Sequence, residues 1–210
     1  MLTAVAFAGA SGAVLAADGG QIVPDTAARH LALDHRPTQL VTILRAVTAT
    51  GTGITPYLVA LCAGLMAAPA LQRLRGHPPV VRFALPAFAF AAWLALGQLL
   101  RFALMTAIAR PRPPEQDWLT HASRWSFPSG HTTTSAMTAG LLVLGLLVRR
   151  PAAHRLWVGL TVLWAAVVGV SRVWLGVHWA TDVIAGWFLA AAWTVLAVVV
   201  AALPSRPRAG

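Results

Sequence analysis

The sequence is poor in charge and contains no lysine. Only 10% of its 210 residues are charged, whereas 58% are hydrophobic; a soluble domain carries about 25% charged residues. This shortage of charge excludes an ordinary soluble domain and indicates an integral membrane protein. All 16 basic residues are arginines, against six acidic residues.

The excess of arginine has two interpretations. A formal net charge of +10 would suggest nucleic-acid binding in a soluble protein. Here many arginines lie in short turns between apolar segments. We therefore expect them to control topology and to contact membrane lipids with anionic headgroups, with no nucleic-acid partner.

The chain also lacks features that would divide it or cross-link it. Its single cysteine, Cys62, excludes an intrachain disulfide. Internal repeats, low-complexity segments and linkers long enough to separate two domains are missing from the sequence. We expect one domain over residues 1–210.

Six apolar segments approach the length of about 20 residues that a bilayer-spanning helix needs. We predict an all-α fold, a bundle of six transmembrane helices over residues 2–17, 55–71, 83–109, 129–148, 156–171 and 179–203. The first segment ends like a signal peptide, but no basic residue precedes it, so we expect an uncleaved span. An amphipathic surface helix is expected around residues 40–47, ending by Gly51.

The arginines predict an orientation for this multi-pass cell-membrane protein. Three regions are rich in arginine and free of acid, and they contain Arg73, Arg75, Arg82, Arg149, Arg150, Arg155, Arg206 and Arg208. The positive-inside rule places these regions and both termini in the cytoplasm. The acidic residues then lie on the extracytoplasmic side, together with three polar clusters: Ala109–Pro113, Phe127–His131 and Ser171–Asp182.

Ionisable residues at a membrane boundary are candidates for function. His178 and Asp182 are four residues apart and share a helix face. A carboxylate there can hold one imidazole nitrogen and leave the other free as a nucleophile. The alternative for this spacing alone is a helix-capping or surface pair.

Further candidates are suited to an oxyanion. Arg172 and Arg112 offer guanidinium forks, although Arg172 can also snorkel to headgroups and Arg112 can belong to an exposed turn. Ser129 is a good N-cap, the Gly130 amide can cradle an anion, and His131 can transfer a proton. The alternative is a well-capped helix with an interfacial histidine.

Together these residues resemble the type 2 phosphatidic acid phosphatase family, which shares its active site with vanadium haloperoxidases. The family pattern has a lysine seven residues before an Arg-Pro pair, then PSGH, then SR, five residues, His, three residues and Asp. The second part matches at Pro128–His131, and the third at Ser171, Arg172, His178 and Asp182. The first part departs, because Met105 stands seven residues before Arg112.

Two arginines lie near the position of the missing lysine. Helical side chains lean toward the N-terminus of their helix, so we expect Arg101 to point away from an outer pocket. Arg110 is closer to the boundary and is a further candidate for phosphate binding.

The resemblance implies a metal-independent membrane phosphatase that needs no cofactor. His178 would form a phosphohistidine, Asp182 would orient it and His131 would transfer protons. Arg112, Arg172, Ser129 and Gly130 would hold the phosphoryl oxygens. Expected substrates are phosphatidate, phosphatidylglycerol phosphate and polyprenyl phosphates or diphosphates, bound at a headgroup depth marked by Trp118, Trp125, Trp174 and Trp179.

Several points stay open at the level of sequence. Two alternative functions follow. Because Met105 replaces the lysine of the family pattern, one alternative is a non-hydrolytic protein that binds or moves a phosphorylated lipid. The family relationship gives the other, a vanadate-dependent oxidant. The loop Glu115–Trp125, with His121 and Arg124, is expected either to select the headgroup or to be an ordinary interfacial loop. The choice of lipid and the oligomeric state are also open.

Overall fold

The structure, a computed structural model, describes residues 1–70 and 76–202. Within these ranges every regular element is helical, as the all-α prediction requires. The α-helices are α1 (Leu2–Ala16), α2 (Val23–Asp34), α3 (Thr38–Ala49), α4 (Thr55–Ala67), α5 (Pro79–Ile108), α6 (Gly130–Arg149), α7 (His154–Trp174) and α8 (Ala180–Ala202). Short 3₁₀ turns, η1 (Ala68–Ala70) and η3 (Glu115–Asp117), follow α4 and α5.

Four of the described helices, α5 to α8, are long and apolar enough to cross a membrane. Helix α1 and the stretch Thr55–Ala70 are apolar but shorter. These two occupy the positions of the first and second predicted spans. The predicted span ends at Leu71 and Leu203 lie outside the described residues, as do Arg73, Arg75, Arg206 and Arg208.

Two helix boundaries differ from the predicted ones in ways that matter for the site. Helix α5 begins at Pro79 rather than at Phe83, because proline fits the first turn of a helix, where its missing N–H is not needed. Helix α7 continues to Trp174. Arg172 therefore lies in the last turn of α7 and not beyond it.

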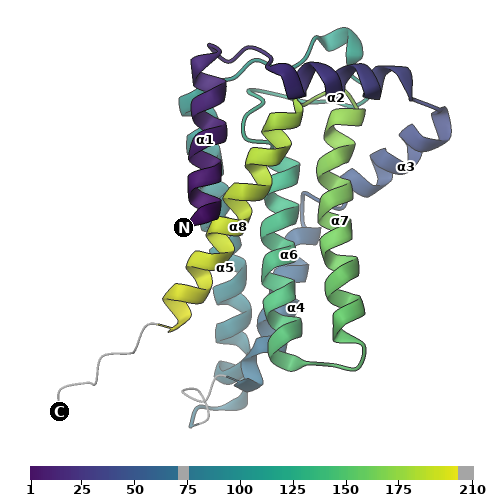
Figure 1. Ribbon diagram of the computed structural model, residues 1–210. Coiled ribbons are helices and arrows are strands. Elements are labelled where there is room, and N and C mark those ends of the chain that lie inside the picture. The colour runs from purple at the N-terminus through teal and green to yellow at the C-terminus, as the bar shows by residue number, and fades with distance from the viewer. Residues whose placement is uncertain (71–75, 203–210) are drawn as a thin grey trace.

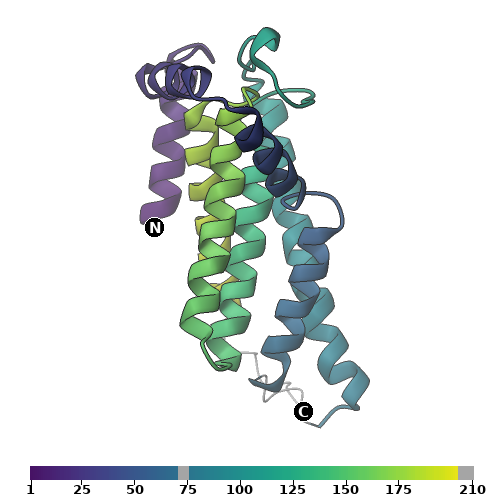
Figure 2. The ribbon, with the colours of Figure 1, turned by 90° about the vertical axis from the view of Figure 1, so that its right-hand side faces the viewer.

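Helix α6 is the centre of the bundle. It packs against α4, α5, α7 and α8, and Figures 1 and 2 show these helices running roughly side by side. Small residues permit this close packing: a Cβ added to Gly145 would lie 2.8 Å from the carbonyl oxygen of Ala63. Such small residues let helix backbones approach one another within a membrane.

The polar clusters gather at one end of the bundle. Helix α2 lies across this end, where α1 ends and α8 begins, and the α5–α6 connection lies there as well (Figures 1 and 2). The predicted surface helix is present as α3, which buries Val41, Leu44 and Thr48 and packs on α7. The α6–α7 turn, flanked by Arg149, Arg150 and Arg155, is at the opposite end.

Candidate active site

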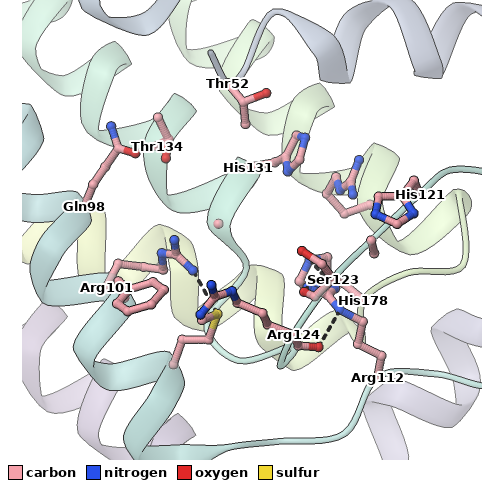
Figure 3. A pocket seen from close by; sticks show the side chains of 15 residues that line it. Thr52, Gln98, Arg101, Arg112, His121, Ser123, Arg124, His131, Thr134 and His178 are labelled. Carbon is pink, nitrogen blue, oxygen red and sulfur yellow. Dashed lines mark hydrogen bonds between the residues drawn. The ribbon is translucent and has the colours of Figure 1, made fainter.

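A pocket of about 420 Å³ opens at the polar end of the bundle. All three sequence clusters reach it, because its lining includes Arg112, Gly130, His131, Arg172 and His178. Figure 3 shows Arg112, His131 and His178 around this pocket. The structure thus brings together five predicted residues from three distant stretches of the chain.

His178 is held between a carboxylate and a guanidinium. Its Nδ1 lies 3.2 Å from Asp182 Oδ2, and its Nε2 lies 2.9 Å from Arg112 Nη1. A guanidinium only donates hydrogen bonds, so Nε2 must accept, and the proton of a neutral ring is then on Nδ1. This tautomer gives Nε2 a lone pair on the side of the pocket.

The backbone before His178 depends on a glycine. Gly176 has a φ of +76°, and a Cβ at this position would collide with the carbonyl oxygen of Asp117. Glycine adopts this left-handed conformation without a steric cost. It lets the chain turn from α7 into α8 and carry His178 to the pocket.

The electrostatic environment keeps His178 neutral. Burial is the main cause that lowers its pKa well below the ordinary value, and the positive charges of Arg112 and Arg172 lower this pKa further. A neutral imidazole retains the lone pair that a nucleophile requires.

Asp182 is a fully buried hub in the first turn of α8. Besides His178, its Oδ2 accepts a hydrogen bond of 2.9 Å from the backbone N–H of Trp179. Its Oδ1 accepts one of 2.6 Å from Arg110 Nη1. The carboxylate is therefore fixed from several sides, and it fixes the ring of His178 in turn.

Arg110 does not contribute to the pocket wall, contrary to its candidacy as a phosphate ligand. Its side chain is fully buried, and its Nη2 lies 2.6 Å from Asp25 Oδ2. Its Nε and Nη2 also donate to the carbonyl oxygens of Gly19 and Gly20. Because its donors are used within the protein, Arg110 is a positioning residue behind Asp182.

Asp25 is a second residue of this buried network, which sequence reasoning missed. Its Oδ1 accepts hydrogen bonds from both the backbone N–H and the hydroxyl of Thr181, at 2.9 and 2.8 Å. Through Thr181 and Arg110, helix α2 is tied to the start of α8. An acidic residue in a mixed segment gives no signal of a partner 156 residues away.

The two predicted arginines are held differently. Arg112 donates to the backbone carbonyls of Ser123, Trp125 and Val177 at 2.8–2.9 Å, which fixes its guanidinium beside His178. Arg172 is 2% exposed. Its Nη1 donates a hydrogen bond to the hydroxyl of Thr48, but its buried Nε has no hydrogen-bond partner among the described residues. An unpartnered buried donor at a pocket is suited to an incoming acceptor.

The start of α6 supplies the third part of the site. Gly130 is its first residue, and backbone N–H groups at a helix N-terminus attract anions. Ser129 holds the predicted N-cap position, but its hydroxyl accepts a hydrogen bond of 2.9 Å from Thr132. Ser129 is fully buried behind the lining, so the structure does not place it in the pocket wall as predicted.

The position of Arg101 differs from the prediction. It was expected to point away, but it lines the pocket together with Met105, Gln98 and Phe102. A long arginine side chain can extend along its helix toward a polar boundary, which overrides the usual lean toward the N-terminus. Its location inside an apolar span is the signal that could have identified it.

The pocket is strongly basic. The charged side chains in its described lining are those of Arg101, Arg112, Arg124 and Arg172. Within the part of the chain that the structure describes, His, Cys, Asp and Glu do not form a group of three suited to a metal ion. The donors that converge here are those that bind an oxyanion such as phosphate.

Comparison with known proteins agrees with this chemistry. A phosphatidylglycerophosphatase B of Bacillus subtilis (strain 168) is 38% identical over 95 residues, which cover 44% of this chain and 46% of that protein. An undecaprenyl-diphosphatase of Sulfolobus acidocaldarius is 37% identical over 87 residues, 40% of this chain and 33% of that protein. The chain thus matches less than half the length of either relative.

Solved structures resemble the fold over much more of the chain. The crystal structure of a transmembrane PAP2 type phosphatidylglycerolphosphate phosphatase from Bacillus subtilis has a TM-score of 0.75 at 23% identity, covering 98% of this chain and 97% of that one. The structure of Aquifex aeolicus LpxE has a TM-score of 0.56 at 20% identity, covering 85% and 99%. The model of the PAP2 superfamily matches residues 86–204, more than half of the sequence, and the chain therefore belongs to the PAP2 superfamily.

Proposed function

We propose that this chain is an integral membrane lipid phosphate phosphatase, which hydrolyses a phosphomonoester or diphosphate group of a lipid through a phosphohistidine. The observation that carries this proposal is the convergence of His178, His131, Arg112, Arg172 and Gly130 on one pocket, with Asp182 bonded to His178. The relatives named phosphatidylglycerophosphatase B and undecaprenyl-diphosphatase support the same activity.

The first chemical step transfers the phosphoryl group to His178. The Nε2 lone pair forms a bond to phosphorus while the bond from phosphorus to the lipid oxygen breaks. His131 donates its proton to the departing oxygen. A phosphoryl oxygen takes over the Arg112 donor that now bonds Nε2, so substrate binding itself frees the nucleophile.

The second step releases phosphate and restores the enzyme. Water attacks the phosphohistidine, loses a proton to His131, and displaces Nε2 from phosphorus. Arg112, Arg172 and the Gly130 amide stabilise the charge on the phosphoryl oxygens in both transition states. Asp182 stabilises the positive charge that the ring of His178 gains through its Nδ1 proton.

The surroundings of the pocket support a lipid substrate at headgroup depth. Trp118, Trp174 and Trp179 donate their indole N–H to backbone carbonyls of neighbouring segments, and Trp125 is 43% exposed. Such aromatic residues favour the membrane interface. Phosphatidate, phosphatidylglycerol phosphate and polyprenyl phosphates or diphosphates fit this description. His121 and Arg124 also line the pocket, which supports a role of loop 115–125 in headgroup choice.

The proposed setting is a single domain that crosses the cell membrane six times, with cytoplasmic termini and an extracytoplasmic site. Its support is the distribution of the acidic residues along the bundle. Arg149, Arg150 and Arg155 flank the turn at the end opposite the pocket, whereas the acidic residues belong to elements at the pocket end. The positive-inside rule then orients the chain.

Phosphate release by purified protein from a panel of lipid phosphates tests this proposal. We expect release that persists in chelator, because guanidinium groups supply the positive charge, and loss of release in His178→Ala. Release that survives in His178→Ala would refute the nucleophile, and release abolished by chelator would refute the metal-independent mechanism. Halide oxidation that requires added vanadate would instead favour an oxidant.

A further inference from the structure

Arg101 reaches the pocket from α5 and ends beside the start of α6. An added Cβ on Gly130 would lie 3.4 Å from Arg101 Cζ and 3.5 Å from its Nη1. The guanidinium therefore lies next to the helix terminus that supplies amide donors to the site. Figure 3 shows Arg101 and Arg124 extending toward each other across the pocket, so two cations share this region.

The hydrogen-bonding capacity of Arg101 is largely unused. Its Nη1 lies 3.1 Å from the sulfur of Met105, and a thioether is a weak acceptor. Its Nε is buried and has no hydrogen-bond partner within the described part of the chain. A partly buried guanidinium that makes few hydrogen bonds is costly to desolvate, and an oxyanion bound beside Gly130 would offset that cost.

Met105 lies beside the guanidinium of Arg101 in the pocket lining. Met105 is 4% exposed and lines the same pocket one helical turn closer to the polar end. It stands where the family pattern has its lysine. Because the sulfur of Met105 contacts the guanidinium of Arg101, a charge carried by either position would come to the same region of the pocket.

We propose that Arg101 is a phosphoryl-binding residue, which supplies from one turn earlier in α5 the cation that the family pattern takes from position 105. The inference rests on the proposed phosphatase function. The positive charge of Arg101 also acts on two other residues of the pocket, His178 and Arg112. Burial is the main cause that lowers the pKa of each, and the charge of Arg101 lowers both pKa values further.

Moving the charge between the two positions tests the proposal. In Arg101→Met we expect kcat/KM for lipid phosphate hydrolysis to fall about a hundredfold, the usual order for removing one donor to a transition-state oxyanion. Adding Met105→Lys to this variant should restore at least about tenfold of that loss, because the ammonium returns a cation to the same region. Inorganic phosphate should raise the melting temperature of the wild type and the double variant more than that of Arg101→Met.

Arg82→Met is the matched control, since Arg82 lies in the same helix at the end away from the pocket; it should keep wild-type kcat/KM. If Arg101→Met does not fold, Arg101→Gln repeats the test with a polar side chain. Activity of the Arg101 variant within about threefold of wild type, or a loss that Met105→Lys does not restore, would overturn the role of Arg101. Either result, with His178→Ala inactive, leaves the phosphatase function intact; an active His178→Ala overturns that function instead.

Discussion

Arg110 Nη1 donates a hydrogen bond of 2.6 Å to Asp182 Oδ1, and both side chains are fully buried. The other oxygen of the same carboxylate holds the ring of His178. The ring of His178, the proposed nucleophile, is therefore positioned by a chain of contacts that continues from Asp182 through Arg110 to Asp25 in α2. The geometry of the pocket therefore depends on a buried network of Asp182, Arg110 and Asp25, which do not line the pocket themselves.

The first prediction concerns the far end of this network. Asp25→Asn leaves Arg110 with a weaker buried partner, and breaking a buried ion pair costs about 3–5 kcal/mol. We expect the free energy of unfolding to fall by this order, together with kcat. Asp34→Asn changes an exposed acid of the same helix and should alter stability by no more than about 0.5 kcal/mol. Equal stability of the two variants in thermal or denaturant melting would contradict the network.

The second prediction concerns proton transfer by His131. General acid catalysis is worth about 10²–10⁴-fold, but a leaving group that is already a weak base needs little protonation. His131→Asn should therefore lower kcat/KM steeply for an alkyl lipid phosphate and far less for p-nitrophenyl phosphate. We use kcat/KM because it reports formation of the phosphohistidine and not its hydrolysis. A similar loss with both substrates would argue against His131 as the acid.

The third prediction follows from the lowered pKa of His178. Burial, and then the charges of Arg112 and Arg172, hold this pKa below the ordinary value of 6.5. The ring thus stays unprotonated and nucleophilic as the pH falls through 6.5, so the acidic limb of kcat/KM, corrected for ionisation of the substrate, should lie below that pH. Removing the positive charge in Arg112→Gln raises the pKa and should move the limb of the residual activity to higher pH. A limb that stays in place would show that Arg112 does not act on His178.

The sequence was sufficient for the parts of the site that have fixed spacing. The four-residue step from His178 to Asp182 and the helix start at Gly130 follow from local geometry, and the long apolar runs predict the helices. The contacts of Asp25 could not be predicted from the sequence, because they join residues that only the packing of α2 on α8 brings together. Arg101 was misjudged because a general rule about side-chain direction does not account for a long side chain that reaches toward the polar boundary.

Trapping the covalent intermediate tests the central claim most directly. Purified protein is mixed with ³²P-labelled lipid phosphate, quenched in alkali within milliseconds to seconds, and digested to locate the label. The proposed mechanism predicts an acid-labile, alkali-stable label on the peptide that contains His178, and no label in His178→Ala. Phosphate release without any labelled protein, or a label on another residue, would contradict it.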